Sequence, residues 1–380
     1  MEQNLSQPKK ERNTGLDALK LFSMFLIVLL HVLGQGGVLA ACPAGSWRGE
    51  TAWLLEIAGY CSVDCFALAT GYVMAGRAVQ YRRILGLWLQ AAFWGVVLTA
   101  AFALAQPGSV GLADWLCALF PVVTKQYWYF TCYFALFFFM PALGRLLEAL
   151  SETAARRLVR TLAALFTLLP CLLVFRVLVP ELPHPDLFVT NNGYSLVWLA
   201  ALWLIGAYCK KYHLALQRRR RTFALWCLGA LAATWLSRFG LEHLTLRLWG
   251  APMEEDFFIR YTSPTILLAS VSLLLLFARL RLRGFWERAV RLLAPAAFGV
   301  YLIHAQPLVW ERLLKGRFAA LAGRSAPLLA LLTLASALAI FLVCLLLDEL
   351  RRALFRLLGT ERLCARAAER FQKKADEAGF

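Results

Sequence analysis

Ten apolar blocks, most of them about twenty residues long, alternate along this chain with short polar segments that carry basic residues. A helix needs roughly 20 predominantly apolar residues to cross the hydrocarbon layer of a membrane. Inside that layer the backbone polar groups must be satisfied internally, which a helix does by itself. The pattern therefore predicts an all-α, polytopic transmembrane helical bundle of about ten spans. We place the spans at 16–36, 52–75, 84–105, 127–147, 161–179, 194–209, 222–240, 261–279, 293–310 and 327–347.

The distribution of charge predicts how this bundle is oriented. The net charge of +17 would suit a nucleic-acid partner, but the basic residues lie in clusters between the apolar blocks, as in cytoplasmic loops. With the N-terminus inside, 30 of the 40 basic residues fall on inner segments. We therefore expect both termini in the cytoplasm, a lipid bilayer as surroundings and no nucleic-acid partner. The predicted division is an N-terminal tail at 1–15, a membrane domain at 16–347 and a basic cytoplasmic tail at 348–380.

The ten cysteines predict neither a disulfide framework nor a metal site. They form no CxxC pair, and most of them lie inside apolar blocks, where a thiol behaves as a small hydrophobic group. Cys61 and Cys65 are one helical turn apart in the same predicted span, which a disulfide does not easily bridge.

Two ionisable residues share one face of the first span. A charged side chain within a bilayer costs on the order of 2.5–3.5 kcal/mol on insertion scales, so each needs a reason. Lys20 and His31 are eleven residues apart. Eleven steps of about 100° bring a helix almost back to its starting angle, so both side chains project from the same face, roughly 16 Å apart along the helix axis. Two explanations remain open. One is a snorkelling lysine with a hydrogen-bonded histidine, and the other is a cation at the inner mouth with a titratable base deeper along the same face.

Three further features allow both a functional and a structural interpretation. Asp64, in the middle of the second span, either orients an imidazole or pairs with another group for structural reasons. His304, in the ninth span, either contacts a substrate or packs while donating to a backbone carbonyl. The cluster that begins at Tyr127 and Trp128 either anchors the fourth span at the membrane interface or stacks against a sugar.

Four sequence blocks, taken in order, resemble the integral-membrane acyltransferase-3 family, which includes bacterial O-acetylases. The family's opening signature, LDxLR followed by an apolar run and a histidine, resembles 16–20 and 27–31, LDALK and IVLLH. Its DxFFxxSGY stretch resembles DCFALATGY at 64–72. Residues 127–141 and FGVYLIH at 298–304 are similar to two further blocks of the family. The resemblance runs from about residue 12 to residue 348.

The resemblance implies transfer of an acyl group, with acetyl-CoA as the expected donor, from the cytoplasm to a hydroxyl of a cell-surface glycan. It implies that His31 is the essential histidine. We expect His31 to act as base or as acyl carrier, with Asp64 as its catalytic partner. Lys20 stands where the family usually has arginine. The compact ammonium group of lysine therefore replaces a guanidinium that can form two parallel hydrogen bonds to a phosphate. The residues expected to bind the donor are Lys20, Arg77, Arg82 and Arg83. Those expected to contact the acceptor are Tyr127, Trp128, Tyr301 and His304.

Two other classes of protein fit the same residues. A transporter or flippase for a glycan or a lipid-linked precursor would also need buried polar groups, but no acyl donor. A non-catalytic membrane partner of a polysaccharide assembly complex would use the aromatic outer face alone. The resemblance favours the enzyme, in the plasma membrane of a bacterium. The sequence leaves the acceptor open among peptidoglycan, teichoic acid, capsule and a secreted small molecule.

Overall fold

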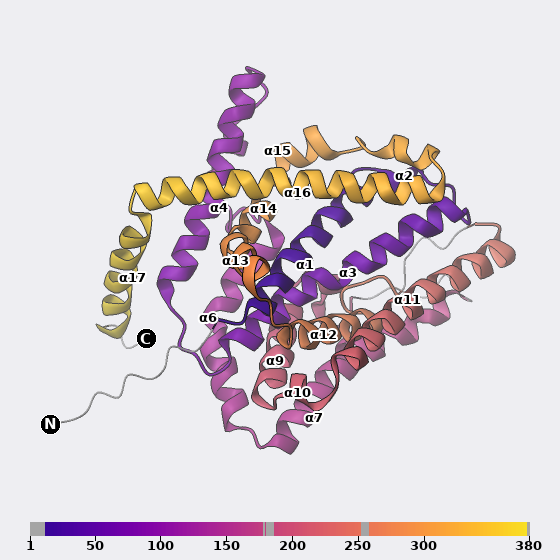
Figure 1. The fold of residues 1–380 in the computed structure, drawn as a ribbon, viewed down its shortest axis with the longest axis horizontal. Helices are drawn as coiled ribbons and strands as arrows, with labels where there is room; N and C mark the ends of the chain where they lie inside the picture. The colour runs from indigo at the N-terminus through magenta and orange to yellow at the C-terminus, as the bar shows by residue number, and fades with distance from the viewer. Residues whose placement is uncertain (1–11, 178, 180–185, 252–257, 378–380) are drawn as a thin grey trace.

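The chain is described here by a computed structural model that covers residues 12–177, 179, 186–251 and 258–377. Within these ranges the chain forms helices and no β-strand (Figure 1). The all-α prediction is therefore confirmed for the part of the chain that the structure describes.

Seven helices in the described part of the chain are long and apolar enough to cross a membrane. They are α1 (Thr14–Leu33) with the short α2 (Val38–Ala41), α3 (Trp47–Met74), α4 (Tyr81–Ala105), α6 (Trp128–Ala149), α7 (Glu152–Ala163) with its continuation to Phe175, α11 (Arg220–Trp249) and α16 (Ala326–Leu357). Within the described residues the number rises to nine if each of two bent helix pairs is counted as one span. One joins Leu187–Gly193 to α9 (Leu196–Lys211), and the other joins Gly284–His304 to Pro307–Gly323.

The remaining helices are shorter or lie at the ends of the bundle. They are α5 (Leu112–Leu119), α10 (Leu214–Gln217), α12 (Pro264–Ala278) and α17 (Thr360–Glu377). The apolar α12 has 15 residues and coincides with the eighth predicted span. Each of the ten predicted spans thus lies on a helical segment, the fifth as far as residue 177. The number of helices that cross a bilayer, and the side on which the termini lie, stay predictions.

The helix α1 runs through the centre of the bundle, side by side with α3 (Figure 1). It also packs against α12, α14 (Ala297–His304) and α16. The Asn13 side chain caps the start of α1 by accepting from the N–H groups of Gly15 and Leu16, and its Nδ2 donates to the Ala278 carbonyl at 2.9 Å. This cap fixes where α1 begins and joins it to the end of α12.

Two glycines allow α3 and α9 to pack with their backbones in close contact. A Cβ atom at Gly71 would lie 2.0 Å from the carbonyl oxygen of Trp203, and one at Gly206 would lie 2.0 Å from that of Leu68. Small residues at such crossings are the usual means of close helix packing in membranes, where van der Waals contact replaces hydrophobic collapse. The orientation of α3, which carries one wall of the site below, depends on this contact.

We expect Gly71→Ala to destabilise the bundle, because the added methyl group would meet a backbone carbonyl that has no rotamer by which to move away. Overpacking of this kind typically costs about 1–3 kcal/mol. The measurement is the midpoint of thermal unfolding in detergent. The control is Gly86→Ala on α4, where the added Cβ would meet open space. Equal midpoints for the two variants would show that α3 and α9 do not pack this closely.

The span predicted at 293–310 contains a break in the structure. The helix α14 ends at His304, and a new helix, α15 (Pro307–Val309), begins three residues later, with a bend of 60° between the two longer segments. Pro307 has no N–H to continue the first helix, and proline is well suited to the first position of a helix. The Gln306 side chain caps the new helix by accepting from the N–H of Val309 at 3.0 Å.

The last predicted span ends at residue 347, whereas the helix α16 continues to Leu357. Asp348 is fully buried in the bundle. It accepts hydrogen bonds from Gln90 Nε2 at 3.1 Å, Trp94 Nε1 at 2.8 Å and Arg351 Nε at 2.7 Å. A buried carboxylate needs such partners. Asp348 and Arg351 therefore belong structurally to the bundle, and the separate helix α17 follows after a turn (Figure 1).

Candidate active site

His31 and His304 form a hydrogen-bonded pair at the ends of two helices. Nδ1 of His31, in the last turn of α1, lies 2.8 Å from Nε2 of His304, the last residue of α14. Nδ1 of His304 lies 2.6 Å from the Val300 carbonyl oxygen, one turn back in its own helix. His304 is 1% exposed, whereas His31 is half-buried and faces a cavity. The buried histidine therefore stands behind the one that is accessible.

This chain of contacts determines which nitrogen atoms carry protons. The Val300 carbonyl only accepts, so Nδ1 of His304 must donate to it. In a neutral imidazole the other nitrogen then accepts, so Nε2 of His304 accepts from Nδ1–H of His31. Nε2 of His31 is left with its lone pair. This nitrogen is the one that can take a proton from a hydroxyl or attack a carbonyl carbon.

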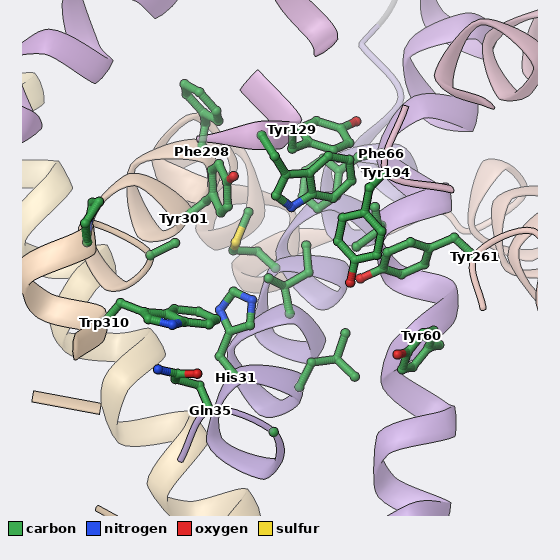
Figure 2. Close-up of a pocket in the computed structure, with 18 of the residues that line it drawn as sticks. His31, Gln35, Tyr60, Phe66, Tyr129, Tyr194, Tyr261, Phe298, Tyr301 and Trp310 are labelled. Atoms are coloured by element: carbon green, nitrogen blue, oxygen red, sulfur yellow. The ribbon is translucent and has the colours of Figure 1, made fainter. Parts of the chain in front are cut away.

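Trp310 covers one side of the His31 ring. The ring centroids are 4.4 Å apart and the planes meet at 81° (Figure 2). Trp310 follows directly after α15, so the bend between His304 and Pro307 is what returns the chain to His31. His31 is thereby held by a hydrogen bond on one edge and by an aromatic contact on another.

The cavity in front of His31 has a volume of about 500 Å³ and an aromatic lining. On the side away from Trp310 lie Tyr194 and Tyr261, with ring centroids 5.0 Å apart (Figure 2). Trp128 contacts both of them, with centroid distances of 4.6 Å and 6.3 Å. Polar groups in the lining come from Gln35, Glu56, Gln126, Glu311 and the tyrosine hydroxyls. Flat apolar faces with a few polar groups between them suit a ring that carries hydroxyl groups.

A second cavity, of about 370 Å³, lies at the other end of α1 and is basic. Its cationic lining residues are Arg12, Lys20, Arg77, Arg83 and Lys210, against one carboxylate, Asp17. Arg12 Nε lies 2.5 Å from Asp17 Oδ2 and Lys20 Nζ lies 3.8 Å from Oδ1. We call this end of the molecule the basic end. The excess of cations makes it suitable for a polyanion, and the charge distribution predicts that it faces the cytoplasm.

The two cavities come close to each other along one face of α1. Met24 lines the aromatic cavity and Lys20 lines the basic one, so one helical turn, about 6 Å, separates these lining residues along the axis. On α3, Phe66 lines the aromatic cavity and Tyr72 lines the basic cavity, and these two residues are about 9 Å apart along the helix axis. The predicted alignment of Lys20 and His31 thus corresponds to two cavities at opposite ends of the same face.

The other predicted site residues occupy different places. Trp128 and Tyr301 line the aromatic cavity. Tyr127 is buried, and its hydroxyl donates to the Leu302 carbonyl at 2.9 Å, which joins α6 to α14. Arg82 does not line the basic cavity; its guanidinium donates to Gln80 Oε1 at 3.1 Å.

Asp64 is not brought to His31. It is fully buried, and its Oδ1 accepts from Trp198 Nε1 on α9 at 3.0 Å. Its Oδ2 has no hydrogen-bond partner among the described residues. Of the two interpretations of Asp64, the geometry matches the structural one, in which the carboxylate joins α3 to α9.

Several residues of the site were not singled out by the sequence. Trp310, Tyr194 and Tyr261 belong to segments next to helix ends, and Arg12 and Lys210 were counted only as loop charges. A signal did exist for Trp310, because Pro307 inside an apolar block indicates a helix break. No local pattern places Tyr194 beside Tyr261.

A bundle of apolar helices with a histidine pair at an aromatic cavity, and with a basic cavity at the other end of the same helix, has the character of a membrane-embedded transferase or transporter. The model of the acyltransferase-3 family, which describes an acyltransferase domain, matches residues 13–348. The chain therefore belongs to this family, and its match covers every residue of the histidine pair, the aromatic cavity and α1. Searches of curated proteins and of solved structures returned no match.

Proposed function

We propose that this protein transfers an acyl group, with acetyl-CoA as donor, to a hydroxyl group of an extracytoplasmic glycan in a bacterial plasma membrane. The observation that carries the proposal is the arrangement of the two cavities, one basic and one with an accessible imidazole, along a single face of α1. A long donor with a polyanionic head and an apolar acyl end fits such an arrangement, because its charged part and its reactive carbonyl lie far apart.

The basic cavity would hold the donor's phosphates. Lys20, Arg77 and Arg83 lie there together with Arg12 and Lys210. Arginine offers planar, bidentate hydrogen bonds to phosphate, whereas lysine acts as a point charge. The pantetheine arm would then extend past Met24 toward His31.

The acceptor would lie against the aromatic cavity wall, with one hydroxyl group directed at His31. In the proposed step, Nε2 of His31 takes the proton of that hydroxyl, and the oxygen attacks the thioester carbonyl. The C–S bond breaks, and the proton on His31 passes to the leaving thiolate, which yields an ester and free CoA thiol. General base catalysis of this kind contributes roughly 10²–10⁴ in rate. In an alternative route, Nε2 of His31 carries the acyl group briefly before it passes to the hydroxyl. This route gives the same products, an ester and free CoA thiol, and uses the same nitrogen.

His304 would orient His31 throughout this cycle. When His31 is protonated, its Nδ1–H still donates to Nε2 of His304, so the contact at 2.8 Å is kept in both protonation states. The imidazole need not turn between taking the proton and returning it. This role differs from the predicted contact of His304 with the acceptor, because the ring stands behind His31 and is 1% exposed.

The test is acyl transfer by the purified protein. Proteoliposomes receive acetyl-CoA with a labelled acetyl group on the side of the basic end and a panel of bacterial surface glycans on the other side. We expect alkali-labile label on a glycan and release of CoA thiol in equal amount. Movement of unmodified glycan across the bilayer without label would favour the transporter. The absence of both, with activity only in the presence of other assembly proteins, would favour the non-catalytic partner.

A further inference from the structure

A third cavity, of about 340 Å³, lies next to the basic cavity and is not used by the site described above. It is formed where the end of α3 and the following loop meet α6 and α9. Its lining residues are Met74, Gly76, Arg77, Ala78, Val79, Met140, Pro141, Gly144, Arg145, Glu148 and Trp203. Arg77 lines both this cavity and the basic one. The two cavities therefore adjoin at the Arg77 side chain, which a ligand occupying both of them would contact.

The third cavity has an apolar wall beside its charged groups. Apolar side chains and Trp203 form much of its wall, which suits a flat base. The indole of Trp203 is 1% exposed, and its Nε1–H has no acceptor within the described part of the chain. This nitrogen is not accessible from the cavity, so the indole contributes an apolar wall and no hydrogen bond.

Charge in the third cavity is net positive. Arg77 and Arg145 contribute two guanidinium groups against the carboxylate of Glu148. Arg145 is exposed to solvent and is free to turn toward a ligand, while Glu148 can accept from an amino or hydroxyl group. The positions of these positive charges matter as much as their sign. Arg145 lies outside the basic cavity, which contains Lys20 and Arg83. The two cavities together offer two cationic places, which suits a ligand with two separated phosphate groups.

We propose that the third cavity binds the adenosine end of the CoA donor, with Arg145 contacting its 3′-phosphate, while the basic cavity binds the pyrophosphate. This assignment rests on the proposed function, since it presupposes a CoA donor. It adds that the protein distinguishes CoA from donors that lack the 3′-phosphate, and it names the residue that does so.

The experiment compares the binding of acetyl-CoA and 3′-dephospho-acetyl-CoA to purified protein in phosphatidylcholine nanodiscs, by calorimetry. We expect the wild type to bind acetyl-CoA more tightly by roughly tenfold, the scale of one charge-assisted hydrogen bond to phosphate. Arg145→Gln should lose most of this preference while its affinity for the dephospho compound stays unchanged. Arg157→Gln is the matched control, because Arg157 is an exposed arginine on α7 outside both cavities.

The outcomes separate this inference from the proposed function. A wild type that binds both compounds equally, or an Arg145→Gln variant that keeps the full preference, would overturn the assignment of the third cavity while leaving the CoA donor in place. Failure of all variants to bind either compound would overturn the CoA donor itself, and the assignment with it. An anionic lipid headgroup could offer a similar phosphate, and the neutral nanodisc excludes it. A preference that appears only after phosphatidylglycerol is added would count against a direct contact with the 3′-phosphate.

Discussion

Replacement of His31 by alanine is expected to abolish acyl transfer while the protein remains folded in the membrane. Nε2 of His31 is the nitrogen of the histidine pair that has a lone pair and faces the aromatic cavity. Loss of a general base typically lowers the rate by roughly 10²–10⁴, and loss of an acyl carrier would leave no transfer at all. The measurement is the amount of alkali-labile label that proteoliposomes transfer from acetyl-CoA to glycan.

The matched control for this variant is His243→Ala. His243 lies on α11, outside the aromatic cavity, and its Nδ1 bonds the Phe239 carbonyl at 2.8 Å, as His304 does with Val300. We expect His243→Ala to transfer acetyl groups at the wild-type rate. Binding of acetyl-CoA at the basic end should be retained in His31→Ala, which separates loss of chemistry from loss of the donor site. Transfer by His31→Ala within a few-fold of wild type would refute the proposed role of this residue.

The periodicity of the sequence predicted the helices and the placement of Lys20 and His31 better than it predicted their partners. Eleven residues at about 100° each determine that two side chains share a face, whatever the rest of the fold does. Lys20 and His31 therefore lie on cavities at opposite ends of that face, as the alignment implied. The neighbours of that face come from distant parts of the chain. His304 is 273 residues away from His31, and no local pattern encodes that contact.

Asp64 illustrates why the expected partner of a buried residue is uncertain. Because α3 packs against α1 on one side and α9 on another, proximity of the second helix to the first does not tell which helix a given residue faces. Val63 faces the aromatic cavity, whereas Asp64, one residue and about 100° further around the helix, accepts a hydrogen bond from Trp198 on α9.

The aromatic wall of the cavity was hard to predict for a different reason, because Tyr194 and Tyr261 belong to connecting segments. Helical periodicity does not apply to such segments.

Variants of His304 are expected to separate orientation of His31 from contact with the acceptor. In His304→Leu the Nδ1–H of His31 loses its acceptor at 2.8 Å, and nothing selects the tautomer that leaves Nε2 unprotonated. We expect the turnover number to fall by roughly 10–100-fold, the scale of loss where a partner that orients a metal-bound histidine is removed. The KM for acetyl-CoA should stay near the wild-type value, because His304 is not among the residues that line the basic cavity.

The informative comparison is between His304→Leu and His304→Gln. The glutamine side chain ends in an amide oxygen that can accept from His31 Nδ1–H, but it has no imidazole to transfer a proton or to stack. If His304 acts by orienting His31, glutamine should restore much of the rate that leucine loses, with no change in which glycan is modified. If His304 instead contacts the acceptor, both variants should raise the KM for the glycan and leave the turnover number at saturation near wild type. Equal loss of turnover in both variants, with unchanged thermal stability, would require the His304 ring itself to take part in the proton transfer.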